Sequence, residues 1–239
     1  MTQPFRMRNK DDGYRPANGP EMMIRLEADA IIITCAKPLE TLSSAVVGGG
    51  FSKAERIVNW KVPLGYEGSD PVRDFHQMLI ERGVPGKATV GLLTAAKLTH
   101  ASIFETDGDG FSMVCCTTAG TGNAARAGLA RPVFSAYEAG TINTVVLIDG
   151  QLTSAAMVNA IITATEAKAA ALADLGVADH LHHAAATGTT TDAIVIGTCK
   201  SERYSGIHRY AGSATMVGSA IGRLVYDTVS EAVSTQKES

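Results

Sequence analysis

The sequence lacks the marks of several large classes of protein. No apolar run approaches the roughly 18 residues that a membrane-spanning helix needs, and residues 1–12 are hydrophilic, without the apolar core of a signal peptide. The 24 acidic residues nearly balance the 21 basic ones, for a formal net charge of −3, whereas binding of nucleic acid or an anionic membrane favours a clear basic excess. We therefore predict a cytoplasmic protein with no nucleic-acid or membrane partner.

Cysteine is scarce as well. Cys35, Cys115, Cys116 and Cys199 stand at spacings that match no metal site. Because Cys115 and Cys116 are neighbours, their side chains would point to opposite faces of a strand. The simplest interpretation is four unpaired, mostly buried thiols in a reducing compartment, and we expect no protein-bound metal.

Apolar residues are abundant, at 45% of the 239 residues, which is enough for the core of one large domain. We predict a single domain at 21–234 between flexible segments at 1–20 and 235–239. Strand-like segments outnumber helical ones, and hairpin turns such as DGDG at 107–110 join several of them. The predicted fold class is α+β: a largely antiparallel sheet packed with three to four helices, with one βαβ-like central unit.

The central unit spans residues 140–198. Residues 144–148 and 193–196 are apolar runs typical of strands buried on both faces. Between them, Thr153 or Ser154 can cap a long helix that Gly176 would end.

That helix carries a polar stripe. Asn159, Thr163 and Glu166 are spaced i, i+4 and i+7 and therefore share one face. A carboxylate on a mostly apolar helix needs a partner or a polar cavity. The stripe indicates either a structural pairing of Glu166 or the wall of a candidate active site.

Two segments are rich in glycine. Gly48–Gly50 predicts either a tight structural crossover or backbone N–H groups that hold an oxyanion. AGTGNAARAG at 119–128 predicts a turn that enters a short helix and could bind an anion. It lacks the full dinucleotide fingerprint and the Lys-Ser/Thr of a P-loop, so it is weak as a nucleotide motif.

Four segments together resemble one family, the adenosylcobinamide amidohydrolases (CbiZ). They are SSAVVGGGF at 43–51, TAGTGNAARAG at 118–128, GTINTVVLIDGQLTSAAMVNAIITATEAKAAAL at 140–172 and ATGTTTDAIVIG at 186–197. The resemblance implies hydrolysis of the amide that joins aminopropanol to the corrin ring, giving adenosylcobyric acid and 1-amino-2-propanol in corrinoid salvage and cobalamin biosynthesis. It implies no cofactor, because the cobalt corrinoid is the substrate.

The resemblance brings no catalytic assignment, so the site is predicted from the chemistry of amide hydrolysis, which needs a nucleophile, a base, oxyanion donors and a proton for the leaving amine. We predict Glu166 as general base on water, with Asp192 or His208 assisting the leaving amine. The predicted substrate-binding residues are Ser44, Gly48, Gly49, Gly50, Asn59, Gly120, Gly122, Asn123, Asn143, Asn159, Thr189 and Thr190.

Alternatives remain open at this point. The nucleophile could be a hydroxyl from Ser43, Ser44 or Thr189–Thr191, or a thiol of Cys115 or Cys116 acting with a histidine. The chain could also be a non-catalytic corrinoid-binding protein, or a phosphate-binding enzyme that uses the GTGNAARAG turn. Gly218 and Gly222 on the last predicted helix would suit close packing in a homo-oligomer.

Overall fold

The structure, a computed structural model, describes residues 2–6, 13–131 and 140–238. Within these residues, eight strands form one sheet in the order β4-β3-β2-β11-β8-β6-β5, with β1 also paired to β2. The strands are β1 (Met22–Glu27), β2 (Ala30–Ser43), β3 (Gly50–Lys61), β4 (Thr89–Thr94), β5 (Ser102–Gly108), β6 (Phe111–Gly120), β8 (Thr141–Asp149) and β11 (Ala193–Cys199).

Three α-helices accompany this sheet in the described residues: α1 (Pro71–Glu81), α2 (Ser154–Asp174) and α3 (Met216–Thr235). The chain starts each helix with a side-chain cap. Asp70 accepts from the Arg73 N–H ahead of α1, and Thr153 accepts from the Ala156 N–H ahead of α2. Gly176, with φ of +66°, follows α2 as predicted.

Four shorter strands form two separate pairs, and a single 3₁₀ turn precedes β5. They are β7 (Ala124–Ala125) with β10 (Gly188–Thr189), β9 (Gln151–Leu152) with β12 (Ile207–His208), and the turn Leu98–His100.

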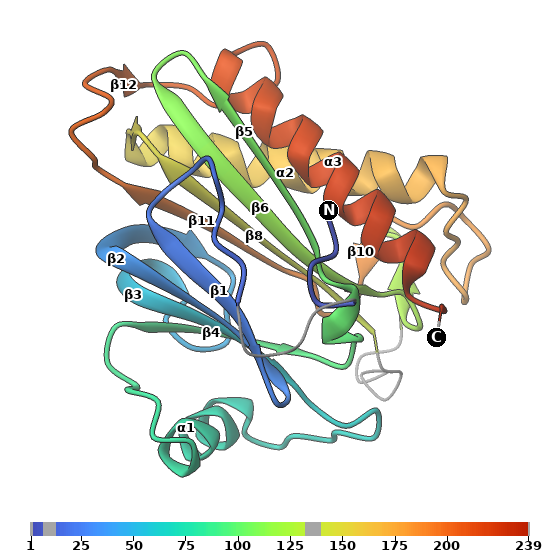
Figure 1. The fold of residues 1–239 in the computed structure, drawn as a ribbon. Helices are drawn as coiled ribbons and strands as arrows, with labels where there is room; N and C mark the ends of the chain where they lie inside the picture. Colours follow the sequence, from blue (N-terminus) through green and yellow to red (C-terminus); the bar gives the residue numbers. More distant parts are fainter. Residues whose placement is uncertain (1, 7–12, 132–139, 239) are drawn as a thin grey trace.

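The helices α2 and α3 lie side by side over one face of the β5–β6–β8–β11 part of the sheet (Figure 1). The opposite face packs on the β1–β2 hairpin, and α1 covers β3 and β4 separately. Cys115 belongs to the first core and Cys116 to the second, so the prediction that they face opposite ways is confirmed.

The predicted α+β class and the central βαβ unit are confirmed. β8 and β11 are parallel neighbours joined through α2, with Val145 opposite Val195. A second parallel pair, β3 with β4, is joined through α1 and adds a crossover that the sequence analysis did not predict. The remaining neighbours of the large sheet are antiparallel.

One local prediction was wrong. No helix follows the turn at 119–128, because Ala124–Ala125 pairs as β7 with β10. Gly218 and Gly222 allow close packing within the chain: a Cβ at Gly218 would meet the Gly212 carbonyl oxygen at 2.1 Å, and one at Gly222 would face Thr163. The homo-oligomer stays a prediction.

The described parts of both termini make hydrogen bonds to the rest of the domain, and the flexibility of the two end segments stays a prediction. The Gln3 amide donates to the His100 carbonyl at 2.9 Å and to the Thr235 hydroxyl at 2.8 Å. The Thr121 N–H donates to Gln236 at 2.9 Å. Residues 1, 7–12 and 239, which belong to the same prediction, lie outside the described residues.

Candidate active site

The curl of the sheet creates a cavity of about 550 Å³ between the ends of β4, β8 and β11 and the loop that leads from β3 to α1. We call it the amide cavity. The residues of its lining that enter the argument are Ser44, Val46, Leu64, Glu67, Ala95, Asn123, Thr141, Asn143 and Thr191.

Asn143 lines this cavity and carries an unpaired, buried oxygen. Its side chain is 1% exposed, and its Nδ2 donates to the Leu93 carbonyl and to Asn59 Oδ1, both at 2.8 Å. A backbone carbonyl can only accept, so the contact with Leu93 fixes which end of the Asn143 amide is nitrogen. Oδ1 of Asn143 has no hydrogen-bond partner.

The residues around Asn143 hold it in this orientation. Asn59 is buried, and its own Nδ2 donates to Thr118 Oγ1 at 2.9 Å, which leaves Asn59 Oδ1 as the acceptor for Asn143. The predicted binding residues Asn59 and Asn143 are therefore brought together, although Asn59 supports the cavity wall without lining it.

Asn123 contributes a second unpaired oxygen. It is 3% exposed, its Nδ2 donates to Thr190 Oγ1 at 2.6 Å, and its Oδ1 has no partner. A buried acceptor without a donor costs about 1–3 kcal/mol. Two residues that line the amide cavity thus each carry a buried oxygen without a donor.

The mouth of the amide cavity is apolar and carries one carboxylate. Leu64 and Val46 are 73% and 40% exposed. Glu67 lies on the same loop as Leu64 and is the only Asp or Glu among the described residues that lines this cavity. Glu67 is not among the residues predicted from the sequence. The available signal was the Pro- and Gly-rich segment VPLGYEGSDP, directly after the strand of Asn59.

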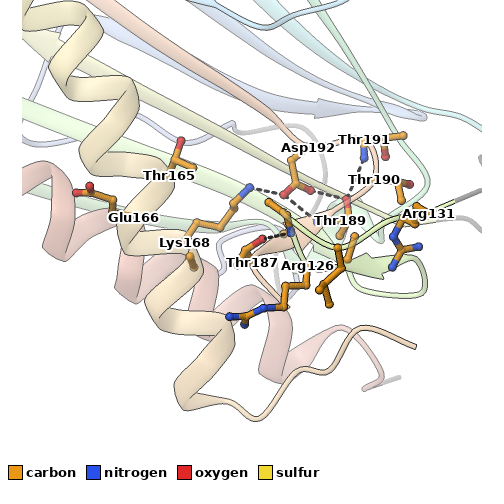
Figure 2. A pocket seen from close by; sticks show the side chains of 15 residues that line it. Arg126, Arg131, Thr165, Glu166, Lys168, Thr187, Thr189, Thr190, Thr191 and Asp192 are labelled. Atoms are coloured by element: carbon orange, nitrogen blue, oxygen red, sulfur yellow. Dashed lines mark hydrogen bonds and ion pairs between the residues drawn. The ribbon is translucent and has the colours of Figure 1, made fainter. Parts of the chain in front are cut away.

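A second cavity, of about 770 Å³, lies between α2 and the β10–β11 turn (Figure 2). We call it the lysine cavity. Those of its lining residues that carry charges or hydroxyls are Arg126, Arg131, Thr165, Glu166, Lys168, Thr187, Thr189, Thr190, Thr191 and Asp192. Thr191 lines both cavities, so the two are adjacent.

Asp192 is held by four donors in the lysine cavity. Lys168 forms an ion pair with it, the Thr189 hydroxyl donates to it, and the N–H groups of Ile142 and Thr189 donate at 3.0 Å each. Gly188 allows this closeness, since a Cβ there would lie 2.4 Å from Asp192 Oδ2. A carboxylate engaged by four donors favours a positioning role over the predicted catalytic one, which stays a prediction.

Glu166 does not join Asp192. Its side chain is exposed and points away from the Lys168–Asp192 pair (Figure 2). The rest of the predicted polar stripe lines neither cavity: Thr163 donates to the Ala211 carbonyl at 2.8 Å, and Asn159 is half-buried. Of the three members of the stripe, only Glu166 lines one of the two cavities, and the catalytic role of Glu166 stays a prediction.

His208 lies at the other end of α2. Thr153, which caps the start of α2, donates its N–H to the His208 carbonyl, and Lys168 is 15 residues further along, about 22 Å at the rise of an α-helix. The His208 ring contacts the Gly110 carbonyl at 3.1 Å and packs edge-on against Phe111. The structure therefore does not bring His208 together with Asp192 or Glu166.

The glycine-rich segments have structural tasks. Gly48 and Gly50 have positive φ in the crossover from β2 to β3, and a Cβ at Gly48 would lie 2.8 Å from the Thr89 carbonyl oxygen. Neither Gly48–Gly50 nor Gly120 or Gly122 lines the two cavities.

The GTGNAARAG turn is not an open anion site either. Its N–H groups at Thr121, Arg126 and Ala127 donate to Gln236, Asp179 and Thr187. Because these N–H groups already donate within the chain, they are not free to bind a phosphate.

The thiols are buried and lie outside both cavities. Burial raises the pKa of Cys115 to about 11, although the Thr228 and Thr117 hydroxyls oppose the shift, and burial raises the pKa of Cys116 further. Neither is a thiolate at neutral pH, which disfavours the cysteine mechanism. Across residues 2–6, 13–131 and 140–238, no group of three or more His, Cys, Asp or Glu side chains could hold a metal ion.

A cavity with an apolar mouth and unpaired amide oxygens at its buried end is typical of a protein that binds a small molecule rich in hydrogen-bond donors. The chain belongs to the adenosylcobinamide amidohydrolase (CbiZ) family, whose model matches residues 15–239, and it is a hydrolase. In the described part of the chain, no helix is long and apolar enough to cross a membrane.

Individual relatives agree with the family match. The adenosylcobinamide amidohydrolase of Methanosarcina mazei is 33% identical over 189 residues, which cover 76% of this chain and 84% of the relative. An uncharacterized protein of Methanocaldococcus jannaschii is 31% identical over 206 residues, covering 77% and 78%. A crystal structure from Pyrococcus horikoshii has a TM-score of 0.44 at 10% identity, covering 94% and 82%, and supports no conclusion.

Proposed function

We propose that this chain hydrolyses the amide bond between aminopropanol and the corrin ring of adenosylcobinamide, releasing adenosylcobyric acid and 1-amino-2-propanol. Family membership and the name of the Methanosarcina mazei relative support the substrate. The single observation on this chain that carries the proposal is the unpaired, orientation-fixed oxygen of Asn143 in the amide cavity.

The size of the cavity determines how such a substrate would bind. A volume of about 550 Å³ suits a drug-sized group, and the corrin macrocycle with its side chains is much larger. One side arm of the corrinoid therefore enters the cavity, and the corrin ring stays over the apolar mouth at Leu64 and Val46. The cobalt enters as part of the substrate, and we propose no further cofactor.

We assign the chemistry to groups that line the same cavity. Glu67 takes a proton from water, whose oxygen attacks the amide carbon. The Ser44 hydroxyl, whose oxygen already accepts from the Ile194 N–H at 3.1 Å, has its proton free to donate to the developing oxyanion. The C–N bond then breaks, and the proton held by Glu67 passes to the leaving nitrogen.

The Lys168–Asp192 pair shapes this site without touching the reacting atoms. Asp192 fixes the start of β8 through Ile142, the residue before Asn143, and fixes the Thr189–Thr191 turn that separates the two cavities.

The test is incubation of the purified protein with adenosylcobinamide in the dark, followed by mass spectrometry, with and without a chelator. The expected result is protein-dependent formation of both products in both arms. Substrate that binds and is returned intact would contradict the reaction and favour a corrinoid carrier. Loss of turnover with the chelator would contradict metal-independent catalysis.

A further inference from the structure

The buried end of the amide cavity has a chemical polarity that selects one side of the scissile bond. Oδ1 of Asn143 is an acceptor whose identity the Leu93 carbonyl fixes, and Oδ1 of Asn123 is an acceptor in the orientation in which Nδ2 donates to the Thr190 hydroxyl. An acceptor pair is satisfied by N–H and O–H donors and is repelled by a carbonyl or carboxylate oxygen.

We infer that this end binds the amine half of the substrate, and that it holds short primary amines, including the 1-amino-2-propanol product, while rejecting short carboxylates. The inference rests on the proposed function and deepens it. Aminopropanol is the distal end of the side arm, so an arm inserted end-first places it deepest. Its amide N–H and its hydroxyl then supply the two donors that Asn143 and Asn123 lack.

Hydrolysis strengthens this contact. The amide nitrogen carries one N–H before cleavage, whereas the released ammonium carries three donors and a positive charge. The other product carries a new carboxylate, which only accepts hydrogen bonds and would face the two asparagine oxygens unfavourably. The amine product is therefore expected to leave last and to inhibit turnover.

The experiment measures binding without any corrinoid, so its result is independent of turnover. Saturation-transfer NMR on the full chain compares 1-amino-2-propanol with 1,2-propanediol, which lacks the ammonium, and with propionate. We expect the amine to bind, the diol to bind at least tenfold more weakly, and propionate to give no signal. Propionate binding as well as the amine would overturn the inference.

Two variants locate the binding. Asn123→Ala removes one acceptor at the loss of a single side-chain hydrogen bond, to Thr190, and should weaken amine binding about tenfold. Ala95→Phe fills the cavity and leaves both amides in place, and should abolish it. Gln77→Ala, which removes an exposed carboxamide on α1, is the matched control and should bind normally. Unchanged amine binding in Ala95→Phe would contradict the assignment.

The outcomes also separate this inference from the proposed function. If the protein binds the amine but does not turn over adenosylcobinamide, the amine subsite is supported and the proposed reaction is contradicted. If the protein turns over adenosylcobinamide but 1-amino-2-propanol neither binds to the protein nor inhibits it, the reaction is supported and the amine subsite is contradicted.

Discussion

Asn143 shows how one contact defines the chemistry of a residue. The Leu93 carbonyl accepts from its amide nitrogen and so leaves the oxygen as the group without a partner. Asn143→Leu would remove this oxygen and leave the Leu93 carbonyl and Asn59 Oδ1 without donors. We expect a loss of about 1–3 kcal/mol in the free energy of unfolding, measured by urea denaturation, together with loss of turnover.

Asn123→Ala is the complementary variant, because it removes a cavity oxygen with little structural cost. It should stay within about 1 kcal/mol of the wild type in stability and still raise KM for adenosylcobinamide. An unchanged KM in a folded Asn123→Ala protein would remove Asn123 from the site.

Two exposed glutamates offer a matched test of the general base. Glu67 lines the amide cavity, whereas Glu166 lies on the rim of the lysine cavity and points away from Asp192. Glu67→Gln should lower kcat by about 100-fold or more, and Glu166→Gln should retain most activity. The opposite result would place the reaction in the lysine cavity and restore the base predicted from the sequence.

The cysteines provide a negative test. Because burial keeps Cys115 protonated at neutral pH, Cys115→Ala and Cys116→Ala should retain turnover, and neither thiol should react with iodoacetamide in the folded protein. Abolished turnover in a folded Cys115→Ala protein would revive the thiol nucleophile.

At the residue scale, sequence reasoning identified Ser44, Asn123 and Asn143 at the cavity, because they stand in segments that resemble the family. It missed Glu67, which follows Asn59 in a loop without a recognisable pattern. It also placed His208 with Asp192, since the sequence does not reveal that the length of α2 separates them.

At the scale of elements, the Lys168–Asp192 pair ties α2 to the β10–β11 turn. Both side chains are nearly buried, at 7% and 10% exposed. Lys168→Met would leave the Asp192 carboxylate buried without its cation, and removing one partner of a buried pair costs about 3–5 kcal/mol. We expect a matching loss in chemical denaturation, with Lys200→Met, at an exposed surface pair with Glu40, as the control near zero.

Asp179 anchors the segment around Arg126 and Arg131 in the same way. Burial alone would raise the pKa of this carboxyl, but the Arg126 N–H, the Arg131 guanidinium and two further N–H groups outweigh burial and hold the pKa below its ordinary value. The folded-state pKa is therefore depressed. Its stabilising contribution is present above about pH 4 and is lost as the pH falls toward the folded pKa.

The wild type should therefore lose stability more steeply than Asp179→Asn between pH 5 and pH 3. Thermal melts across that range measure the difference. Parallel melting curves for the two proteins would show that the Asp179 carboxylate contributes nothing.

Element prediction succeeded where local signals decide the structure. The caps of the mostly apolar α2 and the turn residues of the DGDG hairpin were sufficient. It failed at 119–128, where pairing between β7 and β10 replaces the helix that the turn indicated. That pairing joins residues about sixty positions apart, and no local pattern encodes it.

At the scale of the whole molecule, the sheet curls until β4 approaches β8, and this non-local contact creates the amide cavity. The α+β class followed from counting strands and helices, but the curl depends on how two packed faces meet. The sequence therefore indicated the family and the fold class without indicating which polar residues share a cavity.

The most direct test of the account is the rate of 1-amino-2-propanol release from adenosylcobinamide by the wild type, Ala95→Phe and Gln77→Ala, with folding verified by circular dichroism. The account predicts release by the wild type and Gln77→Ala and at least a hundredfold slower release by Ala95→Phe. A folded Ala95→Phe protein that releases aminopropanol at the wild-type rate would show that the amide bond is cleaved elsewhere.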